Sequence, residues 1–519
     1  MKHLLVTLIS LATFALSASA QLTEQQQIQK LNLVYQHIRN HYVDDVSLEP
    51  LVDEAIKATL KKLDPHSQYL TREDMEQFRA RLQGEFAGVG IRYIMHNDTL
   101  VVRSVIPNSP ASRAGIIPND RIVSVDSSNI VGIDIESAQK LLQGAADSKL
   151  SVEIVRRSEH KPLNVNIKRD YIESKGVSTS YRIGDIGYIA ISTFTKPLCS
   201  EVYSAYKALG DVKSLVIDLR DNGGGALTSG IDLSSMFLTK GDLIASTEGN
   251  IGGDTYYKKQ DRVTITTPLV VIINEGSASA SEIFVGAIQD HDRGVVVGRT
   301  SFGKALVQRI YDLKDGSGLI LTIARAKTPS GRTIQRPYEM GKGDEYRKDK
   351  ARYMHPDSIA HNPELMFTTL KLGRKVYGGG GITPDIYIND PEIGISTKLA
   401  KLYSDGVFEH VAIEIWDRLS TKNILKQYPS IENFAAEFVV ESDIFELFYS
   451  YTDSVDSDFT PLDREFIHTM IKATMAEQIY ESWARYYLYC QEYDCTLQRA
   501  LEVAEDTSIY NSILFCEDK

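Results

Sequence analysis

The first stretch of apolar and polar positions after residue 21 follows a helical period. In LVDEAIKATLKKL (residues 51–63) apolar residues recur at intervals of three and four, which predicts an amphipathic helix. The pattern breaks at Pro65 and restarts at Thr71, where Asp74 three positions later resembles a capping box. We therefore expect a small helical domain over residues 21–82.

The next segment, residues 83–171, changes to a strand-like pattern. Three runs alternate or are rich in β-branched residues, namely GIRYIMHNDTLVVRSVI, DRIVSVD and KLSVEIVRR. A single helical pattern, IESAQKLLQG, lies between the second and third runs. This arrangement predicts a β-rich module with one main helix.

From residue 172 to residue 393, short apolar runs alternate with helical patterns. The expected strands include IGYIAISTF, SLVIDLR, PLVVIIN and GVVVGR, and the expected helices LCSEVYSAYKALG, LTSGIDLSSMFL and SEIFVGAIQ. Strands that alternate with helices in this way predict crossover units and a mainly parallel sheet, so the fold class is α/β. Residues 394–519 have polar, aromatic-rich helical patterns and no evident chemistry.

The first twenty residues, MKHLLVTLISLATFALSASA, have a basic start, an apolar run and a small-residue end. This composition predicts a secretory signal peptide over residues 1–20, and no later apolar run reaches the ~18 residues that a membrane helix needs. We expect an exported protein that works in a bacterial periplasm and is at most peripheral to a membrane. The net charge of −12 argues against nucleic acid as a partner.

Cysteine and histidine spacings give no metal-site pattern. Of Cys199, Cys490, Cys495 and Cys516, the last three cluster near the end, where an exported protein can oxidise a pair. The eleven histidines contain no His-Glu-x-x-His arrangement. We expect neither a metal nor another cofactor.

Three loops of the α/β part carry candidate chemistry, because open α/β sheets place their sites where strands end. The first, DLRDNGGGAL (residues 218–227), has three glycines before an expected helix. Such a turn either presents backbone N–H groups to an anion or needs glycine only for positive φ. It lacks the Gly-Lys-Ser/Thr ending of a phosphate loop, which disfavours nucleotide binding.

The second loop lies within VVIINEGSASASEIFVGAIQ (residues 270–289), where a strand turns into a helix. Ser279 and Glu282 have the spacing of a capping box, which is a purely structural explanation for the serine. A serine at a strand–turn–helix bend with helix N–H groups behind it is also the layout of a nucleophile and an oxyanion site. No Gly-x-Ser-x-Gly elbow is present.

The third loop, GRTSFGKALVQ (residues 298–308), places Lys304 among apolar residues. A buried lysine loses its proton more easily and can act as a general base, although a surface lysine at the start of a strand is the commoner case. The letters from Ser301 to Lys304 also match the Ser-x-x-Lys signature of penicillin-binding proteins, but its companion motifs are absent.

Together these segments resemble the C-terminal processing peptidases, which are serine/lysine endopeptidases with an inserted PDZ domain. The matching pieces follow the family's order over about residues 31–390: LDPHSQYL, GEFAGVGI, VIPNSPASRAGIIPNDRIVSVD, GDIGYIAISTF, DLRDNGGG, NEGSASASEIFVGAIQDHDRGVVVG, SFGKALVQ, AKTPSGRTIQ and GITPDI. The resemblance implies a crotonase/ClpP-like parallel-sheet core at residues 172–393 and a PDZ domain at residues 83–171. The helical domain before them and the helical extension after them complete the expected organisation.

The resemblance also implies roles for individual residues. The nucleophile falls on Ser279, the general base on Lys304, 25 positions later, and the supporting polar residue on Gln308. The oxyanion donors fall on the backbone N–H groups of Ala280 and Gly224. In a regular strand Gln308 would lie roughly 13 Å from Lys304, so this segment must bend or Gln308 must act through another group.

The chain departs from the family pattern at one position in the glycine loop and at one position after the lysine. Gly223 stands where the family usually has proline, and Ala305 where it usually has glycine. The first change loosens the glycine loop and weakens the assignment of Gly224.

For the PDZ module, Gly88 and Gly90 are expected to let successive N–H groups converge on a substrate's terminal carboxylate. Val89, Ile91 and the helix near residues 138–142 would line the adjoining pocket. Asn119 stands where the family's turn usually has glycine.

We therefore predict an exported serine endopeptidase that recognises protein and peptide substrates by accessible C-termini, and a homo-oligomer is one expected state of it. One alternative is a catalytically silent PDZ adaptor or chaperone that keeps the peptidase fold. Another is a Ser–His hydrolase that uses His291.

Overall fold

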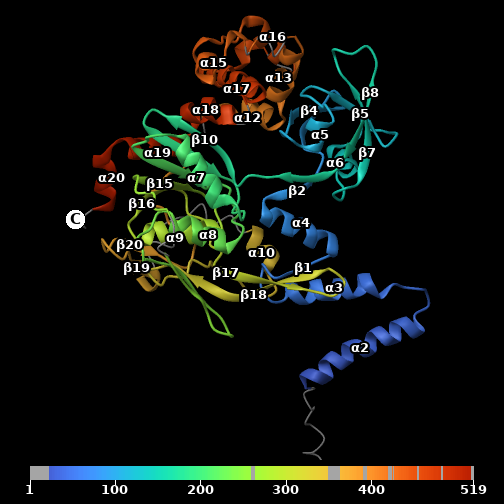
Figure 1. Cartoon of the computed structure of the whole chain (residues 1–519), viewed down its shortest axis with the longest axis vertical. Coiled ribbons are helices and arrows are strands. Elements are labelled where there is room, and N and C mark those ends of the chain that lie inside the picture. The colour runs from blue at the N-terminus through green and yellow to red at the C-terminus, as the bar shows by residue number, and fades with distance from the viewer. Residues whose placement is uncertain are drawn as a thin grey trace, which may run out of the picture.

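The structure is a computed structural model that describes residues 23–258, 263–348, 363–389, 394–418, 424, 426–452, 455–480 and 483–515. Figure 1 shows its arrangement. The expected signal peptide and Cys516 lie outside the described residues.

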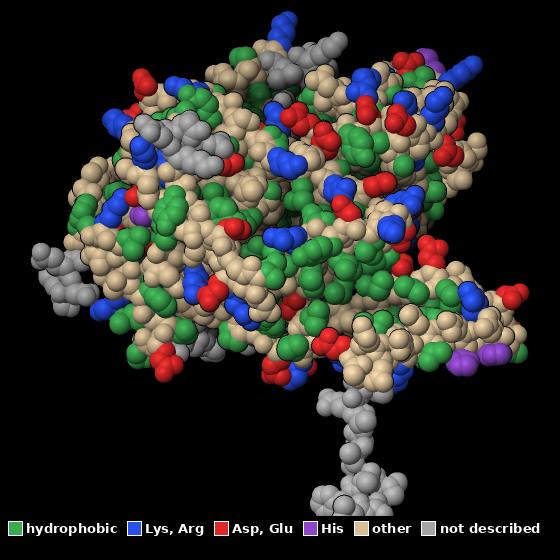
Figure 2. All heavy atoms as spheres, turned by 60° about the horizontal axis from the view of Figure 1, so that its bottom comes forward, with side chains coloured by type: hydrophobic (Ala, Val, Ile, Leu, Met, Phe, Trp, Pro, Cys, Tyr) green, Lys and Arg blue, Asp and Glu red, His purple; other side chains and the backbone are tan. Residues whose placement is uncertain are grey.

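The N-terminal part is helical, with one short strand that joins it to the rest. Its elements are α2 (Glu24–His41), α3 (Leu48–Lys61), β1 (Gln68–Leu70) and α4 (Arg72–Gln83). The predicted cap is present, since the Thr71 hydroxyl accepts a hydrogen bond from the Asp74 N–H at 3.2 Å. Helix α2 projects from the body and buries none of its residues. Figure 2 turns this end forward and shows Lys/Arg and Asp/Glu side chains interspersed on the surface.

The PDZ module is a separate antiparallel sheet in the order β3-β4-β5-β7-β8, with β6 paired to β5. Its elements are β3 (Ile91–His96), β4 (Thr99–Val105), α5 (Pro110–Arg113), β5 (Arg121–Val125), β6 (Ser128–Asn129), α6 (Ile135–Leu142), β7 (Lys149–Val155) and β8 (Leu163–Lys168). The strands β2 (Glu85–Gly88) and β9 (Asp170–Glu173) pair with each other where the chain enters and leaves the module. The module is therefore an insertion whose entering and leaving segments are joined by this two-stranded pairing.

The part predicted to be the peptidase core is built on a six-stranded sheet in the order β10-β11-β12-β15-β16-β21. The strands are β10 (Val177–Ile183), β11 (Ile186–Ile191), β12 (Ser214–Asp218), β15 (Leu269–Ile273), β16 (Gly294–Gly298) and β21 (Ile386–Tyr387). All pairings are parallel except that of β10 with β11, which confirms the predicted mainly parallel sheet. Every residue of β12, β15 and β16 is buried, because both faces of the sheet are covered.

Helices from different parts of the chain cover the two faces. One face packs against α7 (Leu198–Ala208), α8 (Leu227–Ser235) and α9 (Ala280–Asp290). The other packs against α18 (Trp483–Tyr493), α19 (Cys495–Glu505) and α20 (Thr507–Leu514). Neighbouring residues such as Val270 and Val271 therefore belong to opposite cores. The end of the helical extension is thus a structural layer of the peptidase core.

The first part of the extension forms a helical domain with its own aromatic core. It contains α12 (Thr397–Ser404), α13 (Val407–Arg418), α15 (Ile431–Glu437), α16 (Ser442–Ser450) and α17 (Pro461–Tyr480). It contacts the PDZ module through an Arg103–Glu477 ion pair and through His96, whose Nδ1 lies 2.7 Å from the Nδ1 of His410. The extension therefore touches both the PDZ module and the core sheet.

A second, smaller sheet lies beside the core and carries the segment that follows Lys304. It contains β13 (Leu243–Glu248), β14 (Thr255–Tyr257), β17 (Leu306–Asp312) and β18 (Gly318–Lys327), together with β1. The pairing of β17 with β18 has a β-bulge between Val307 and Gln308. Nearby are α10 (Gly343–Lys348) and the β19 (Met366–Thr368) and β20 (Lys375–Tyr377) hairpin.

No helix within the described ranges is long and apolar enough to cross a membrane.

The cap formed by the extension gives a stability prediction. Leu497 is fully buried against the sheet, so Leu497→Ala should lower the free energy of unfolding by about 3 kcal/mol through lost burial and a cavity. Urea denaturation followed by tryptophan fluorescence measures this, since Trp483 packs on the same core. The matched change Leu462→Ala, at an exposed site on α17, should cost less than about 1 kcal/mol. Equal effects would contradict the proposed packing.

Candidate active site

The turn between β15 and α9 holds Ser279 in a strained conformation. Its φ is 59° and its ψ is −111°, a region that residues with side chains rarely adopt. Ser279 is half-buried and directly precedes Ala280, the first residue of α9, while Ser277 and Ser281 are fully buried. Backbone strain of this kind persists only where the surroundings enforce it, and it often marks functional sites.

The two flanking serines have structural partners. The Ser277 hydroxyl donates to the Leu219 carbonyl at 2.7 Å, and the Ser281 hydroxyl donates to the Asn222 carbonyl at 2.9 Å. Both bonds fasten the turn to the segment that begins the glycine loop. Of the three serines, Ser279 is therefore the one placed to meet a substrate.

The glycine loop lies directly against Ser279. A Cβ on Gly224 would lie 2.8 Å from the Ser279 Cβ and 2.9 Å from the Ala280 nitrogen, and the φ of Gly224 is 95°. Both facts require glycine at this position. Gly223 differs, since a Cβ there would meet nothing within 4 Å. The space at Gly223 therefore admits the side chain that the family pattern usually has there.

The predicted oxyanion donors differ in their bonding. The Gly224 N–H donates to the Asn222 side-chain oxygen at 2.9 Å, so in this conformation it is engaged within the loop. Ala280 lies in the first turn of α9, where backbone N–H groups have no intrahelical acceptor. The arrangement supports Ala280 as a donor more directly than Gly224.

The fully buried Glu282 carboxylate holds both halves of the candidate site together. Its oxygens accept hydrogen bonds from four donors: the N–H groups of Ser279 (2.8 Å), Gly303 (2.7 Å) and Lys304 (2.8 Å) and the Ser301 hydroxyl (2.6 Å). Burial raises the pKa of Glu282, and the four hydrogen bonds oppose this rise. The sequence indicated only its capping partner Ser279, because the other three donors come from a distant segment.

Lys304 lies in the irregular segment before β17. Burial lowers the pKa of Lys304, and the charges of Glu282 and Asp64 oppose this decrease. The neighbouring Ala305 N–H donates to the Gln335 side chain at 2.8 Å, which fixes the backbone on the other side of the lysine. Lys304 thus has a desolvated side chain, and its backbone N–H donates to the same Glu282 carboxylate oxygen as the Ser279 N–H.

Gln308 is separated from Lys304 by the start of β17 and the β-bulge. Its amide donates to the Leu306 carbonyl at 2.9 Å and to the Thr322 hydroxyl at 3.3 Å. The Thr322 hydroxyl in turn donates to Asp64 at 3.0 Å. These hydrogen bonds connect Gln308 to Asp64 through Thr322, and the supporting role of Gln308 toward Lys304 stays a prediction.

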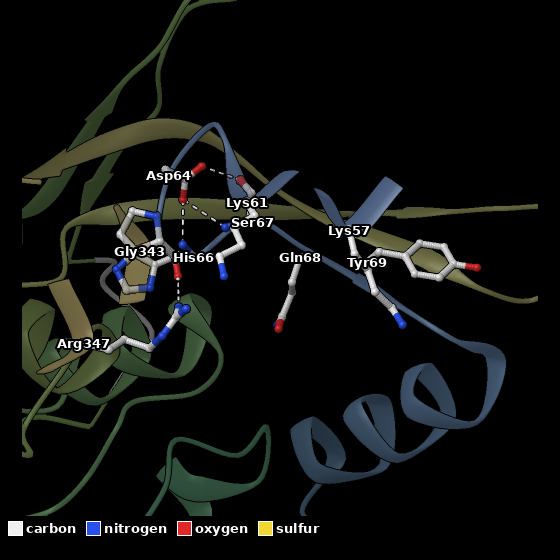
Figure 3. A pocket seen from close by; sticks show the side chains of 10 residues that line it. Lys57, Lys61, Asp64, His66, Ser67, Gln68, Tyr69, Gly343 and Arg347 are labelled. Atoms are coloured by element: carbon white, nitrogen blue, oxygen red, sulfur yellow. Dashed lines mark hydrogen bonds between the residues drawn. The ribbon is translucent and has the colours of Figure 1, made fainter. Parts of the chain in front are cut away.

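The loop from Asp64 to Tyr69 brings the N-terminal domain to Lys304. It lines a pocket of about 250 Å³ together with Lys57, Lys61, Gly343 and Arg347 (Figure 3). Asp64 accepts hydrogen bonds from the His66 N–H (2.8 Å) and the Ser67 hydroxyl (2.5 Å). Burial and the charge of Lys304 lower the pKa of His66 to about 4, so this imidazole is neutral at physiological pH. Neither Ser279 nor Lys304 lines this pocket. Two of the residues that do line it, Asp64 and His66, interact electrostatically with Lys304.

The alternative base His291 lies at the wrong end of α9. It follows the last residue of this eleven-residue helix, which puts it about 18 Å along the axis from Ser279. Its Nε2 lies 2.7 Å from the Leu243 carbonyl. The Ser–His hypothesis is therefore wrong on geometric grounds.

The predicted carboxylate loop of the PDZ module lies at the start of β3. Gly90 has a φ of 85°, and a Cβ on it would lie 2.2 Å from the Ser109 Cβ, so only glycine fits. Val89 is buried and Ile91 half-buried in one cluster with Ala138 and Leu142 of α6. Gly88 ends β2 immediately before this loop.

Two further features bear on ligand binding. Strand β3 is the end strand of the PDZ sheet among the described strands, as an added peptide strand requires. Asn119 has a φ of 68°, which explains why asparagine can stand there in place of glycine. Over the described residues, no three His, Cys, Asp or Glu side chains are grouped so that they could hold a metal ion.

Comparison with known families agrees with this architecture. The model of peptidase family S41 matches residues 185–341, a PDZ domain model matches residues 101–156, and the model of the N-terminal domain of the activating protease CtpB matches residues 9–74. A family of unknown function matches residues 398–481 in the helical extension.

Individual relatives of this chain are named carboxy-terminal processing proteases. The chain is 37% identical to the carboxy-terminal-processing protease of Bartonella bacilliformis over 60% of this chain and 73% of that protein. It is 32% identical to the carboxy-terminal processing protease CtpA of Bacillus subtilis over 60% of this chain and 68% of that one. A solved structure, the photosystem II D1 C-terminal processing protease, is 25% identical, with a TM-score of 0.36 over 69% of this chain and 86% of its own.

The family models and the two sequence relatives define a PDZ-containing serine protease of peptidase family S41. The chain belongs to the C-terminal processing peptidase family.

The Glu282 carboxylate gives the first test of the site. In Glu282→Gln one acceptor oxygen becomes an NH₂ group that faces N–H donors, so the Ser279 and Lys304 backbones should separate and kcat should fall by about a hundredfold or more. Peptide hydrolysis measures this loss. The control Glu275→Gln removes a carboxylate on the same turn that pairs with Arg299, and it should retain kcat within about threefold. A fully active Glu282→Gln enzyme would contradict the organising role.

Proposed function

We propose that the protein is an exported endopeptidase that recognises the C-terminal tails of protein substrates and cleaves them with a Ser279–Lys304 pair. The observation that carries this proposal is the Glu282 carboxylate. One oxygen of it accepts the backbone N–H groups of both Ser279 and Lys304, each at 2.8 Å. Ser279 and Lys304, which are 25 positions apart in the sequence, are thereby held next to the same carboxylate oxygen. Ser279 is partly accessible to solvent, whereas Lys304 is largely desolvated.

The residues support a stepwise amide hydrolysis. Neutral Lys304 takes the proton of the Ser279 hydroxyl as its oxygen attacks the substrate carbonyl, which gives a tetrahedral oxyanion. The Ala280 N–H and an N–H of the glycine loop stabilise that charge. The protonated lysine then gives its proton to the leaving amine, and the carbonyl–nitrogen bond breaks to leave an acyl-enzyme. Water, deprotonated by Lys304, hydrolyses the ester and restores Ser279.

The PDZ module supplies the proposed selection of substrates. The backbone around Gly88, Val89 and Gly90 would receive the terminal carboxylate, and the outer edge of β3 would pair with the peptide before it. The half-buried Ile91 and helix α6 would contact its apolar side chains. A peptide with a free carboxylate should then be cleaved faster than the same peptide with an amidated C-terminus.

Export to a bacterial periplasm is part of the proposal and rests on the composition of residues 1–20. Cell fractionation of the full-length chain checks it. A homo-oligomer remains a prediction that light scattering can check.

The silent-adaptor alternative makes opposite predictions for the active-site variants. It needs the PDZ module but neither the strained serine nor the desolvated lysine. The retention of both residues in one hydrogen-bonded arrangement favours the enzyme.

Two substitutions test the pair. Ser279→Ala and Lys304→Ala should each lower kcat/KM for a peptide with an apolar C-terminus by a factor of roughly 10⁴ or more, because each removes a reacting group. Mass spectrometry of the cleavage products measures this. Full activity in either variant would contradict the mechanism.

Matched controls separate chemistry from folding. Ser281→Ala removes one buried hydrogen bond and should cost about 1 kcal/mol of stability without abolishing cleavage. Ser277→Ala removes two, because the Ser277 hydroxyl also accepts the Asn274 N–H at 3.0 Å, and it should cost about 2 kcal/mol, again without abolishing cleavage. His291→Ala should also remain active.

The pH dependence follows from Lys304. Its pKa is lowered from the ordinary value of 10.5, and only the neutral amine can accept a proton. Activity should therefore rise with pH as Lys304 deprotonates, with a midpoint below 10.5, and a kcat/KM profile measures it. His66, with a pKa of about 4, should contribute no inflection near neutrality. A flat profile between neutral pH and pH 10 would count against Lys304 as the base.

A further inference from the structure

The glycine loop is connected to the helical extension by a largely buried ion pair. Arg220 follows β12 and begins the loop that leads to Gly224. Its Nη1 lies 2.6 Å from the Oδ2 of Asp494, and its Nη2 lies 2.6 Å from the Oδ2 of Asp218. The side chains of Arg220, Asp218 and Asp494 are 21%, 6% and 10% exposed, so solvent screens these charges weakly.

Asp494 is held firmly in place by its own helix. It is the N-cap of α19, where its Oδ1 accepts the Leu497 N–H at 2.8 Å while its Oδ2 faces Arg220. Helix α19 packs against the core sheet through Leu497 and Val503. The carboxylate therefore presents a fixed charge to the start of the glycine loop.

The conformation of the glycine loop depends on contacts with neighbouring segments, because glycine backbones have few conformational restrictions of their own. Asp221, Gly224 and Gly225 have φ values of 57°, 95° and 147°, and three successive glycines lose much conformational entropy on ordering. Asn222 secures the middle of the loop, since its carbonyl accepts the Ala278 N–H at 2.9 Å. Arg220 secures its beginning.

Asp218 alone does not complete the coordination of Arg220. The Oδ2 of Asp218 also accepts the Tyr188 hydroxyl at 2.8 Å. Asp218 accepts hydrogen bonds from the backbone N–H, the Nε and the Nη2 of Arg220, but none from Nη1 is present among the described residues. Without Asp494, Nη1 would lose its partner in a poorly solvated position. The guanidinium would then turn toward water and displace the loop that contacts Ser279.

We infer that Asp494, in the helical extension, is a positioning residue for the peptidase reaction that acts through Arg220 on the glycine loop. This inference rests on the proposed function. The extension thus contributes to the active site as well as to the stability of the core.

The test uses Asp494→Asn in the full-length chain, because asparagine caps a helix about as well as aspartate but lacks its charge. We expect kcat for the apolar peptide to fall about tenfold while KM changes by less than about twofold. The melting temperature should also fall, because Arg220 keeps a largely buried charge with one charged partner fewer. Hydrogen exchange of the loop amides at residues 223–225 should accelerate by a similar factor. Exchange does not depend on catalysis, so it tests the inference even if the chain were inactive.

Asp506→Asn is the matched control, because Asp506 caps α20 through the N–H groups of Ser508 and Ile509 in the same way. It should change neither kcat nor loop exchange. In an Arg220→Gln background, Asp494→Asn should have little further effect, since the two residues act as one unit.

Unchanged kcat and loop exchange in Asp494→Asn would overturn the inference, and so would equal changes in Asp506→Asn. An inactive wild-type chain with accelerated loop exchange in Asp494→Asn would contradict the proposed function and leave the positioning contact supported.

Discussion

The buried Glu282 carboxylate is the interaction on which the candidate site depends. Burial of a carboxylate costs free energy unless its oxygens are well bonded, and here four donors supply those bonds. Three of the donors are backbone N–H groups, so the charge fixes chain positions and leaves the side chains of Ser279 and Lys304 to the chemistry. Helix α9 contributes both the carboxylate and the first-turn N–H of Ala280. The strain at Ser279 is sustained by this bonding and by the two flanking serines.

The same low-polarity environment serves two purposes. It strengthens the hydrogen bonds around Glu282, and it lowers the pKa of Lys304 toward the range in which a neutral amine can accept a proton. The negative charges of Glu282 and Asp64 oppose the effect of desolvation and so limit the decrease in the pKa of Lys304. Asp64 comes from the N-terminal domain and reaches Gln308 through Thr322. The domain that precedes the PDZ module is therefore part of the lysine's surroundings.

The helical extension has a larger structural role than its sequence indicates. Its last helices cover the second face of the parallel sheet, its first part contacts the PDZ module through Arg103 and Glu477, and Asp494 reaches the glycine loop. One continuous segment thus touches the sheet, the proposed recognition module and the loop beside Ser279.

The sequence by itself determined the α/β class, the strand–helix alternation, the strand-to-helix bend at Ser279 and the family, because these depend on local periodicity and on motifs. Only the tertiary structure decided which distant groups meet. Glu282 appeared as a helix cap, and its bonds to Ser301, Gly303 and Lys304 depend on how two segments pack. The engagement of the Gly224 N–H by Asn222, the β-bulge before Gln308 and the partners of the extension were likewise inaccessible. Each depends on long-range contacts, whose pairing no local pattern specifies.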